Sequence, residues 1–135
     1  MTDFPVTIFH NPDCGTSRNG LRAILDQGYA PKVVLYLESG WTASQLTDLI
    51  ARMGVSARAV LREKGTPAET LGLLDPAVSD ETLISAMVEH PILVNRPIVE
   101  TPLGVVMARP SERVFEILDR RPERFVKEDG EVVVL

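Results

Sequence analysis

Two short apolar runs, "PVTIFH" at residues 5–10 and "KVVLYL" at residues 32–37, stand on either side of a helical segment at the start of the chain. Both runs are rich in β-branched residues and are typical of strands. Between them, Leu21, Ile24 and Leu25 lie at the i, i+3, i+4 spacing of a buried helix face. A strand, a helix and a second strand in this order predict two parallel strands joined by a right-handed crossover. The chain therefore opens as an α/β fold.

The pattern changes over residues 42–90, where helical periodicities dominate and no convincing strand occurs. We expect a helical insert here, in four pieces at residues 42–54, 56–63, 67–74 and 79–90. The first helix of the chain is expected to be capped by Thr16 or Ser17 and to stop at Gly28.

Sheet signals resume after the insert. "IVET" (98–101) and "GVVMA" (104–108) predict a hairpin, "PSERVFEILD" (110–119) predicts a last helix, and the tail 126–135 could add an edge strand or fray. This order of elements predicts a thioredoxin-like fold of the α/β class, with a mixed sheet flanked by helices and an inserted helical subdomain at about residues 42–90.

Composition limits the classes of function. A chain of 135 residues, 44% of them hydrophobic, predicts a single domain over residues 1–135. A net charge of −5 argues against nucleic-acid binding by general attraction. The sequence contains neither an 18-residue apolar run nor a signal peptide, so we expect a cytoplasmic protein with no membrane span. With one cysteine we expect no internal disulfide and no metal site made of cysteines alone, and two histidines, His10 and His90, are too few for most zinc sites without carboxylates.

The one cysteine, Cys14, follows the first strand and precedes the first helix. At a helix N-terminus, unpaired N–H groups and the helix dipole favour a thiolate and lower the pKa of a cysteine. His10 lies close enough in sequence to add positive charge when protonated, and Ser17 or Thr16 could donate a hydrogen bond to the thiolate. We therefore predict that Cys14 is an activated nucleophile.

Spacing excludes two familiar thiol chemistries. Ser17 occupies the second position of a C-x-x-C motif, so the chain cannot complete a dithiol cycle by itself. A cysteine phosphatase loop needs an arginine six residues after the cysteine, and that position is Gly20. Any redox reaction of Cys14 must therefore use a thiol from another molecule.

Three arginines stand at the edges of predicted elements: Arg62, Arg96 and Arg109. Guanidinium groups bind tetrahedral oxyanions through forked donors, so these residues would form an anion site if they converged near the helix N-terminus. Their spacing alone does not establish convergence.

Several segments together resemble the glutaredoxin-coupled arsenate reductases of the thioredoxin-like superfamily. They are "HNPDCGTSRN", "LYLE", "RAVLREK", "HPILVNRPIVETPLG", "ARPSE" and "KEDGE". The resemblance implies that Cys14 is the nucleophile and that His10 and Ser17 help to hold its thiolate. It also implies that arsenate or later arsenic intermediates are bound by three side chains, those of Arg62, Arg96 and Arg109.

The resemblance implies a reaction as well as a site. Cys14 would attack arsenate, glutathione would displace a second oxygen as a co-substrate, and glutaredoxin would supply the thiol that releases arsenite, as in arsenic detoxification. A cis peptide bond is implied at Arg96–Pro97. The apolar end "VVVL" departs from the longer polar tail of the family.

Two other functions remain open on the residues alone. One is a thioredoxin-like redox regulator that binds RNA polymerase, although such a switch usually uses C-x-x-C. The other is a monothiol glutathione-dependent oxidoreductase, which would use Cys14 but would not require Arg62 or Arg109.

Overall fold

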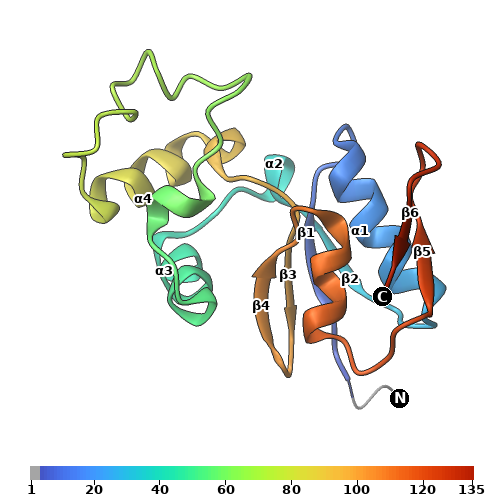
Figure 1. The fold of residues 1–135 in the computed structure, drawn as a ribbon. Helices are drawn as coiled ribbons and strands as arrows, with labels where there is room; N and C mark the ends of the chain where they lie inside the picture. The colour runs from blue at the N-terminus through green and yellow to red at the C-terminus, as the bar shows by residue number, and fades with distance from the viewer. Residues whose placement is uncertain (1–3) are drawn as a thin grey trace. The chain divides into compact units, whose positions relative to one another are not determined.

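The structure, a computed structural model, describes residues 4–135. The chain forms two compact units (Figure 1). The first contains the described residues up to Leu35 together with Arg96–Leu135, and the second is Tyr36–Asn95. The second unit is the expected helical insert, extended by a few residues at each end. A single domain over the whole chain stays a prediction.

A four-stranded mixed sheet organises the first unit. Its strands are β1 (Thr7–His10), β2 (Lys32–Leu35), β3 (Ile98–Thr101) and β4 (Gly104–Met107), in the spatial order β2-β1-β3-β4. β1 and β2 are parallel, whereas β3 is antiparallel to both β1 and β4. The predicted parallel pair and the predicted hairpin are therefore both confirmed.

Helix α1 (Gly15–Asp26) and the 3-10 helix η3 (Ser111–Ile117) pack against this sheet. Ile8, Val99 and Val106 are paired across β1, β3 and β4 and belong to the core cluster that α1 and η3 complete. Because these side chains alternate with others along each strand, they gather on one face of the sheet. The predicted thioredoxin-like α/β class, a mixed sheet flanked by helices, is confirmed.

The start of α1 differs from the prediction. Cys14 itself is the N-cap, with extended backbone angles and no capping hydrogen bond from its side chain, while Thr16 and Ser17 lie inside the helix. The expected cap at Thr16 or Ser17 is therefore wrong. The cause is the tight turn before the helix, in which the Cys14 N–H donates to the Asn11 carbonyl at 3.1 Å and brings the first helical residue forward to Gly15.

The chain ends in a second, two-stranded sheet. β5 (Arg124–Val126) pairs antiparallel with β6 (Val132–Val134), so the apolar tail forms a strand. Phe125 at the centre of β5 is buried and meets Phe115 of η3 edge to face, with ring centroids 5.7 Å apart. This contact attaches the terminal hairpin to the core of the first unit.

The second unit is helical, as expected. Its helices are α2 (Tyr36–Ser39), α3 (Ala43–Met53), η1 (Ala57–Val60), α4 (Asp80–Glu89) and η2 (Pro91–Leu93). The side chains of Thr42 and Ser79 cap α3 and α4, and Gly54 closes α3 with a left-handed φ of 72°. Within residues 4–135 no helix is long and apolar enough to cross a membrane.

Two predicted elements around this unit were wrong, one in its existence as a helix and one in where it ends. The helical piece expected at residues 67–74 is a series of turns, because Gly72 adopts a left-handed φ of 73° and the Thr66 hydroxyl donates to the Arg62 carbonyl. The strand expected at residues 32–37 ends at Leu35, since Tyr36 already begins α2.

Candidate active site

Cys14 lies where β1 ends and α1 begins. Between them, the side chain of Asn11 accepts a hydrogen bond from the Asp13 N–H at 3.0 Å, and the backbone carbonyl of Asn11 accepts one from the Cys14 N–H at 3.1 Å. This turn presents the Cys14 side chain at the N-terminus of α1. The residue as a whole is buried, with 8% of its surface exposed.

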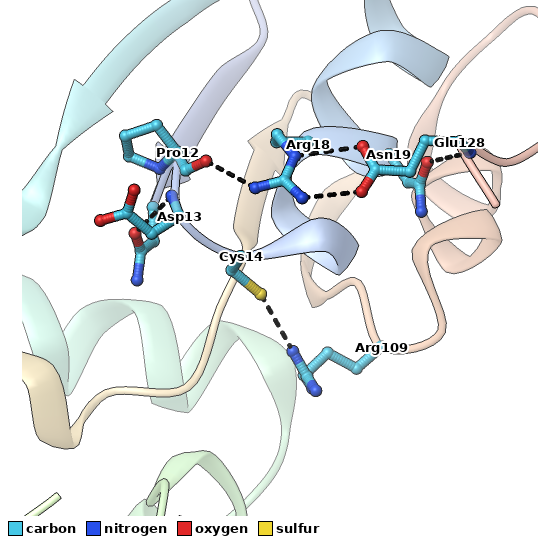
Figure 2. Close-up of polar contacts among 8 residues, drawn as sticks. Pro12, Asp13, Cys14, Arg18, Asn19, Arg109 and Glu128 are labelled. Atoms are coloured by element: carbon cyan, nitrogen blue, oxygen red, sulfur yellow. Dashed lines mark hydrogen bonds and ion pairs between the residues drawn. The ribbon is translucent and has the colours of Figure 1, made fainter. Parts of the chain in front are cut away.

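Two arginines from the far end of the sequence meet at Cys14. Arg109 Nη1 lies 3.7 Å from Cys14 Sγ (Figure 2), and the same nitrogen donates to the Arg96 carbonyl at 2.9 Å. The Arg96 side chain and the Ser17 backbone N–H also hydrogen-bond the sulfur. Cys14, Arg96 and Arg109 therefore form one cluster, the thiolate site.

These contacts control the ionisation of the thiol. Burial raises the pKa of Cys14. Four interactions lower this pKa, and the largest is the hydrogen bond from the Arg96 side chain. The others are the hydrogen bond from the Ser17 N–H, the charge of Arg96 and the hydrogen bond from Arg109. Together they lower the pKa of Cys14 from 9.0 to about 7. The thiolate form of Cys14 is therefore favoured near neutral pH relative to an ordinary cysteine, and the thiolate is the form that attacks as a nucleophile.

His10 and Ser17 form a buried pair beside the thiolate site. His10 Nδ1 lies 2.6 Å from Ser17 Oγ, which also accepts a hydrogen bond from the Asn11 N–H at 3.0 Å. Burial, followed by the positive charge of Arg18, lowers the pKa of His10. Both effects favour the neutral imidazole, and a contribution of positive charge from His10 when it is protonated stays a prediction.

The described contacts of Ser17 also refine its expected role. Its hydroxyl bonds His10 and Asn11, and it is the backbone N–H of Ser17 that bonds the Cys14 sulfur. The Ser17 hydroxyl therefore joins α1 to the end of β1 through His10 and Asn11. Their catalytic roles stay predictions.

Arg62 belongs to the helical unit. Its backbone N–H donates to the Leu93 carbonyl at 2.8 Å, and its Nη1 lies 3.5 Å from Asn95 Oδ1. These contacts fix Arg62 against Leu93 and Asn95, at the end of its own unit. Its expected contact with arsenate stays a prediction.

Both arginines of the thiolate site precede a cis proline. The Arg96–Pro97 bond is cis, as the family resemblance implied, and the Arg109–Pro110 bond is cis as well. The second was not predicted, although the Arg-Pro pair in the sequence was a signal for it, because X-Pro bonds adopt the cis form far more readily than others.

Sequence reasoning missed two further residues at the site. Arg18 donates to the Pro12 carbonyl at 2.8 Å and forms a two-pronged contact with Glu128, with Nη2–Oε1 at 2.7 Å and Nε–Oε2 at 3.1 Å (Figure 2). The matched segment "KEDGE" contains Glu128 and was the one signal that could have pointed to it.

In the part of the chain that the structure describes, no group of three His, Cys, Asp or Glu side chains could hold a metal ion. The charged groups that face Cys14 are instead arginines, which suit an oxyanion.

Comparison with known proteins agrees with this geometry. The sequence model of the ArsC family matches residues 9–117. The chain is 50% identical to an arsenate reductase of a Synechocystis species, over 99% of this chain and 94% of that protein, and 53% identical to an arsenate reductase of Escherichia coli, over 96% and 92%. Among solved structures, the arsenate reductase from Vibrio cholerae matches 87% of this chain and 100% of its own, with a TM-score of 0.82 and 40% identity. The chain belongs to the ArsC family.

Proposed function

We propose that this protein is an oxidoreductase that reduces arsenate to arsenite, with Cys14 as its nucleophile. The observation that carries the proposal is a thiol with a pKa of about 7 held against the arginines Arg96 and Arg109. The relatives named above are arsenate reductases, and the chain aligns with them over nearly its whole length. Arsenate is a tetrahedral oxyanion, which forked guanidinium donors bind well.

In the first step, the Cys14 thiolate attacks the arsenic atom of arsenate. An As–S bond forms, and one oxygen leaves as water after taking up protons. Arg96 and Arg109 stabilise the negative charge on the remaining oxygens, and Arg62 is the third arginine proposed to bind arsenate. Donors that are already in place for developing charge lower the barrier to such a step.

External thiols complete the reduction. Glutathione displaces a second oxygen as water and forms a second As–S bond. A glutaredoxin thiol then attacks the glutathione sulfur, so that a mixed disulfide forms and the electron pair of the As–S bond stays on arsenic, which becomes As(III). Hydrolysis of the Cys14–As bond releases arsenite and regenerates the thiol. Two thiols are oxidised to one disulfide for each arsenic reduced.

The proposal fits the single cysteine of the chain. Cys14 has no partner thiol in its own sequence, so both reducing equivalents come from other molecules. Glutathione and glutaredoxin are kept reduced in the cytoplasm, where we propose that the protein acts in arsenic detoxification. The proposed steps use no metal and no tightly bound cofactor.

The direct test is arsenite formation from arsenate in the presence of glutathione and glutaredoxin. We expect turnover by the unmodified protein and none by Cys14→Ser, which keeps the size of the side chain. Omission of either thiol source should also stop turnover. The proposal would be contradicted if Cys14→Ser formed arsenite, or if the turnover rate did not depend on the presence of glutathione. Reduction of mixed disulfides without arsenite formation would favour a monothiol oxidoreductase instead.

The arginines are tested separately through the concentration dependence on arsenate. Arg62→Ala, Arg96→Ala and Arg109→Ala should each lower kcat/KM by roughly tenfold or more, since a charged hydrogen bond contributes about 1.5–3 kcal/mol. Arg121→Ala is the matched control, because Arg121 is exposed at the surface of the first unit. If kcat/KM for arsenate in all four variants equalled that of the unmodified protein, Arg62, Arg96 and Arg109 would not bind the substrate.

A further inference from the structure

We infer that Glu128 is a positioning residue that holds the Cys14 turn in its reactive geometry, acting through Arg18. The inference deepens the proposed function, on which it rests for the role of Cys14 as a nucleophile. Glu128 lies 110 residues after Arg18 in the sequence, in the turn between β5 and β6, and does not itself contact the sulfur in Figure 2.

The contact between the terminal hairpin and α1 has three parts. The Glu128 carboxylate takes two hydrogen bonds from the Arg18 guanidinium, at 2.7 and 3.1 Å. The Glu128 backbone N–H donates to the Asn19 side chain at 2.9 Å. Arg18 then uses its remaining terminal nitrogen to hold the Pro12 carbonyl at 2.8 Å. One guanidinium therefore ties the hairpin to the turn two residues before Cys14, and we call this arrangement the Glu128 clamp.

Glycine at the first position of α1 leaves room for the clamp. A Cβ atom added at Gly15 would lie 3.0 Å from Glu128 Oε1 and 3.5 Å from Arg18 Nη2. The first of these distances is tighter than normal van der Waals contact, so a side chain at residue 15 would force the carboxylate to move. The clamp therefore passes directly over the residue that follows Cys14.

The clamp can act on Cys14 in two opposite ways. If it fixes the turn, it keeps the sulfur aligned with the Ser17 N–H, Arg96 and Arg109, and its loss raises the pKa of Cys14. If Glu128 is only a counter-charge for Arg18, its loss leaves more positive charge near the thiolate and lowers that pKa. Arg18 does interact electrostatically with Cys14, as well as with Asp13 and His10. The direction of the shift therefore separates positioning from charge compensation.

We expect positioning to dominate. Exposed ion pairs contribute little to overall stability, and both side chains here are partly exposed, at 46% for Arg18 and 39% for Glu128. A two-pronged Arg–carboxylate contact nevertheless fixes direction well. The effect of Glu128 should therefore appear at the turn and the thiol and leave the melting temperature almost unchanged.

The test is the pH dependence of Cys14 alkylation by iodoacetamide. This neutral reagent reacts with the thiolate form of cysteine, and the assay needs no arsenate. We expect Glu128→Gln to move the midpoint upward by about one pH unit, which slows alkylation at pH 7 by about fivefold. Glu123→Gln is the matched control, since it removes the same charge from an exposed residue just before β5. Its midpoint should stay at about 7.

Two further variants keep the outcome interpretable. Gly15→Ala leaves every charge in place but displaces the carboxylate, so it should also raise the midpoint. In an Arg18→Ala background, Glu128→Gln should cause no additional shift, because the effect passes through Arg18.

A midpoint for Glu128→Gln that falls or stays constant would overturn the inference, as would an undiminished shift in the Arg18→Ala background. Because these readouts follow only the thiol, the inference can fail while arsenate reduction persists, and it can hold if arsenate proves not to be the substrate.

Discussion

At the scale of single residues, the chemistry of the site depends on how strongly its donors favour the Cys14 thiolate. The pKa of Cys14 is lowered from 9.0 to about 7, so the thiolate fraction grows as pH rises through 7 and is lost as pH falls below it. Because Arg109 supplies one of the hydrogen bonds responsible, Arg109→Ala should raise the pKa and shift the alkylation profile to higher pH. The measurement is the rate of iodoacetamide alkylation from about pH 5 to about pH 10.

Arg121→Ala serves as the control for this prediction too, since it removes the same charge from an exposed position. Its profile should match that of the unmodified protein. An Arg109→Ala profile that keeps its midpoint at about 7 would mean that Arg96 and the Ser17 N–H stabilise the thiolate without help from Arg109.

The hydroxyl of Ser17 is predicted to matter for stability more than for the acidity of Cys14. Ser17→Ala removes the acceptor of the Asn11 N–H and the partner of His10, in a residue that is fully buried. A buried donor left without a partner costs about 1–3 kcal/mol. Urea denaturation should show this loss, while the alkylation midpoint should remain near 7 because the backbone N–H of residue 17 is retained. A large rise of the midpoint with unchanged stability would contradict this account.

At the scale of elements, the position of α1 depends on a close approach to the chain around Pro97. A Cβ atom added at Gly20 would lie 3.2 Å from Pro97 Cγ and 4.0 Å from Ile8 Cδ1. Alanine normally stabilises the interior of a helix by about 1 kcal/mol relative to glycine. At Gly20 we expect most of this gain to be lost to crowding against Pro97.

Gly20→Val is the sharper form of this prediction. Its larger side chain should cost about 1–3 kcal/mol through overpacking, measured as the free energy of unfolding in urea. The Arg96 side chain beside Pro97 should then hold the thiolate less well, so the alkylation midpoint should rise as stability falls. If Gly20→Ala stabilises the protein by the full helical increment, the space beside Pro97 is larger than the structure indicates.

Elements with strong local signals were predictable from the sequence. The strands at the start of the chain, the β3–β4 hairpin and the caps at Thr42 and Ser79 depend on periodicity and on nearby side chains, which the sequence displays. The cap of α1 was not predictable in the same way. Its position depends on the turn that Asn11 closes, and Cys14 is not among the usual capping residues.

At the scale of the whole molecule, the site is assembled from residues that are distant in sequence. Cys14 and Arg109 are 95 residues apart, and Arg18 and Glu128 are 110 apart. The local sequence around Cys14 indicates a reactive thiol, and the family resemblance named the arginines. Neither periodicity nor spacing could show that the terminal hairpin returns to α1, because that contact depends on how Phe125 packs in the tertiary fold.

The anchoring of the terminal hairpin is the final prediction. Phe125 is 4% exposed and packs in the core of the first unit against Phe115, whereas Val134 on the same hairpin is 83% exposed. Phe125→Ala should cost about 3–5 kcal/mol in the free energy of unfolding, while Val134→Ala should change it by less than about 0.5 kcal/mol. Because the hairpin carries Glu128, hydrogen exchange at the amides around Cys14 should quicken in Phe125→Ala. Loss of stability without faster exchange there would show that the hairpin supports the core but not the active-site turn.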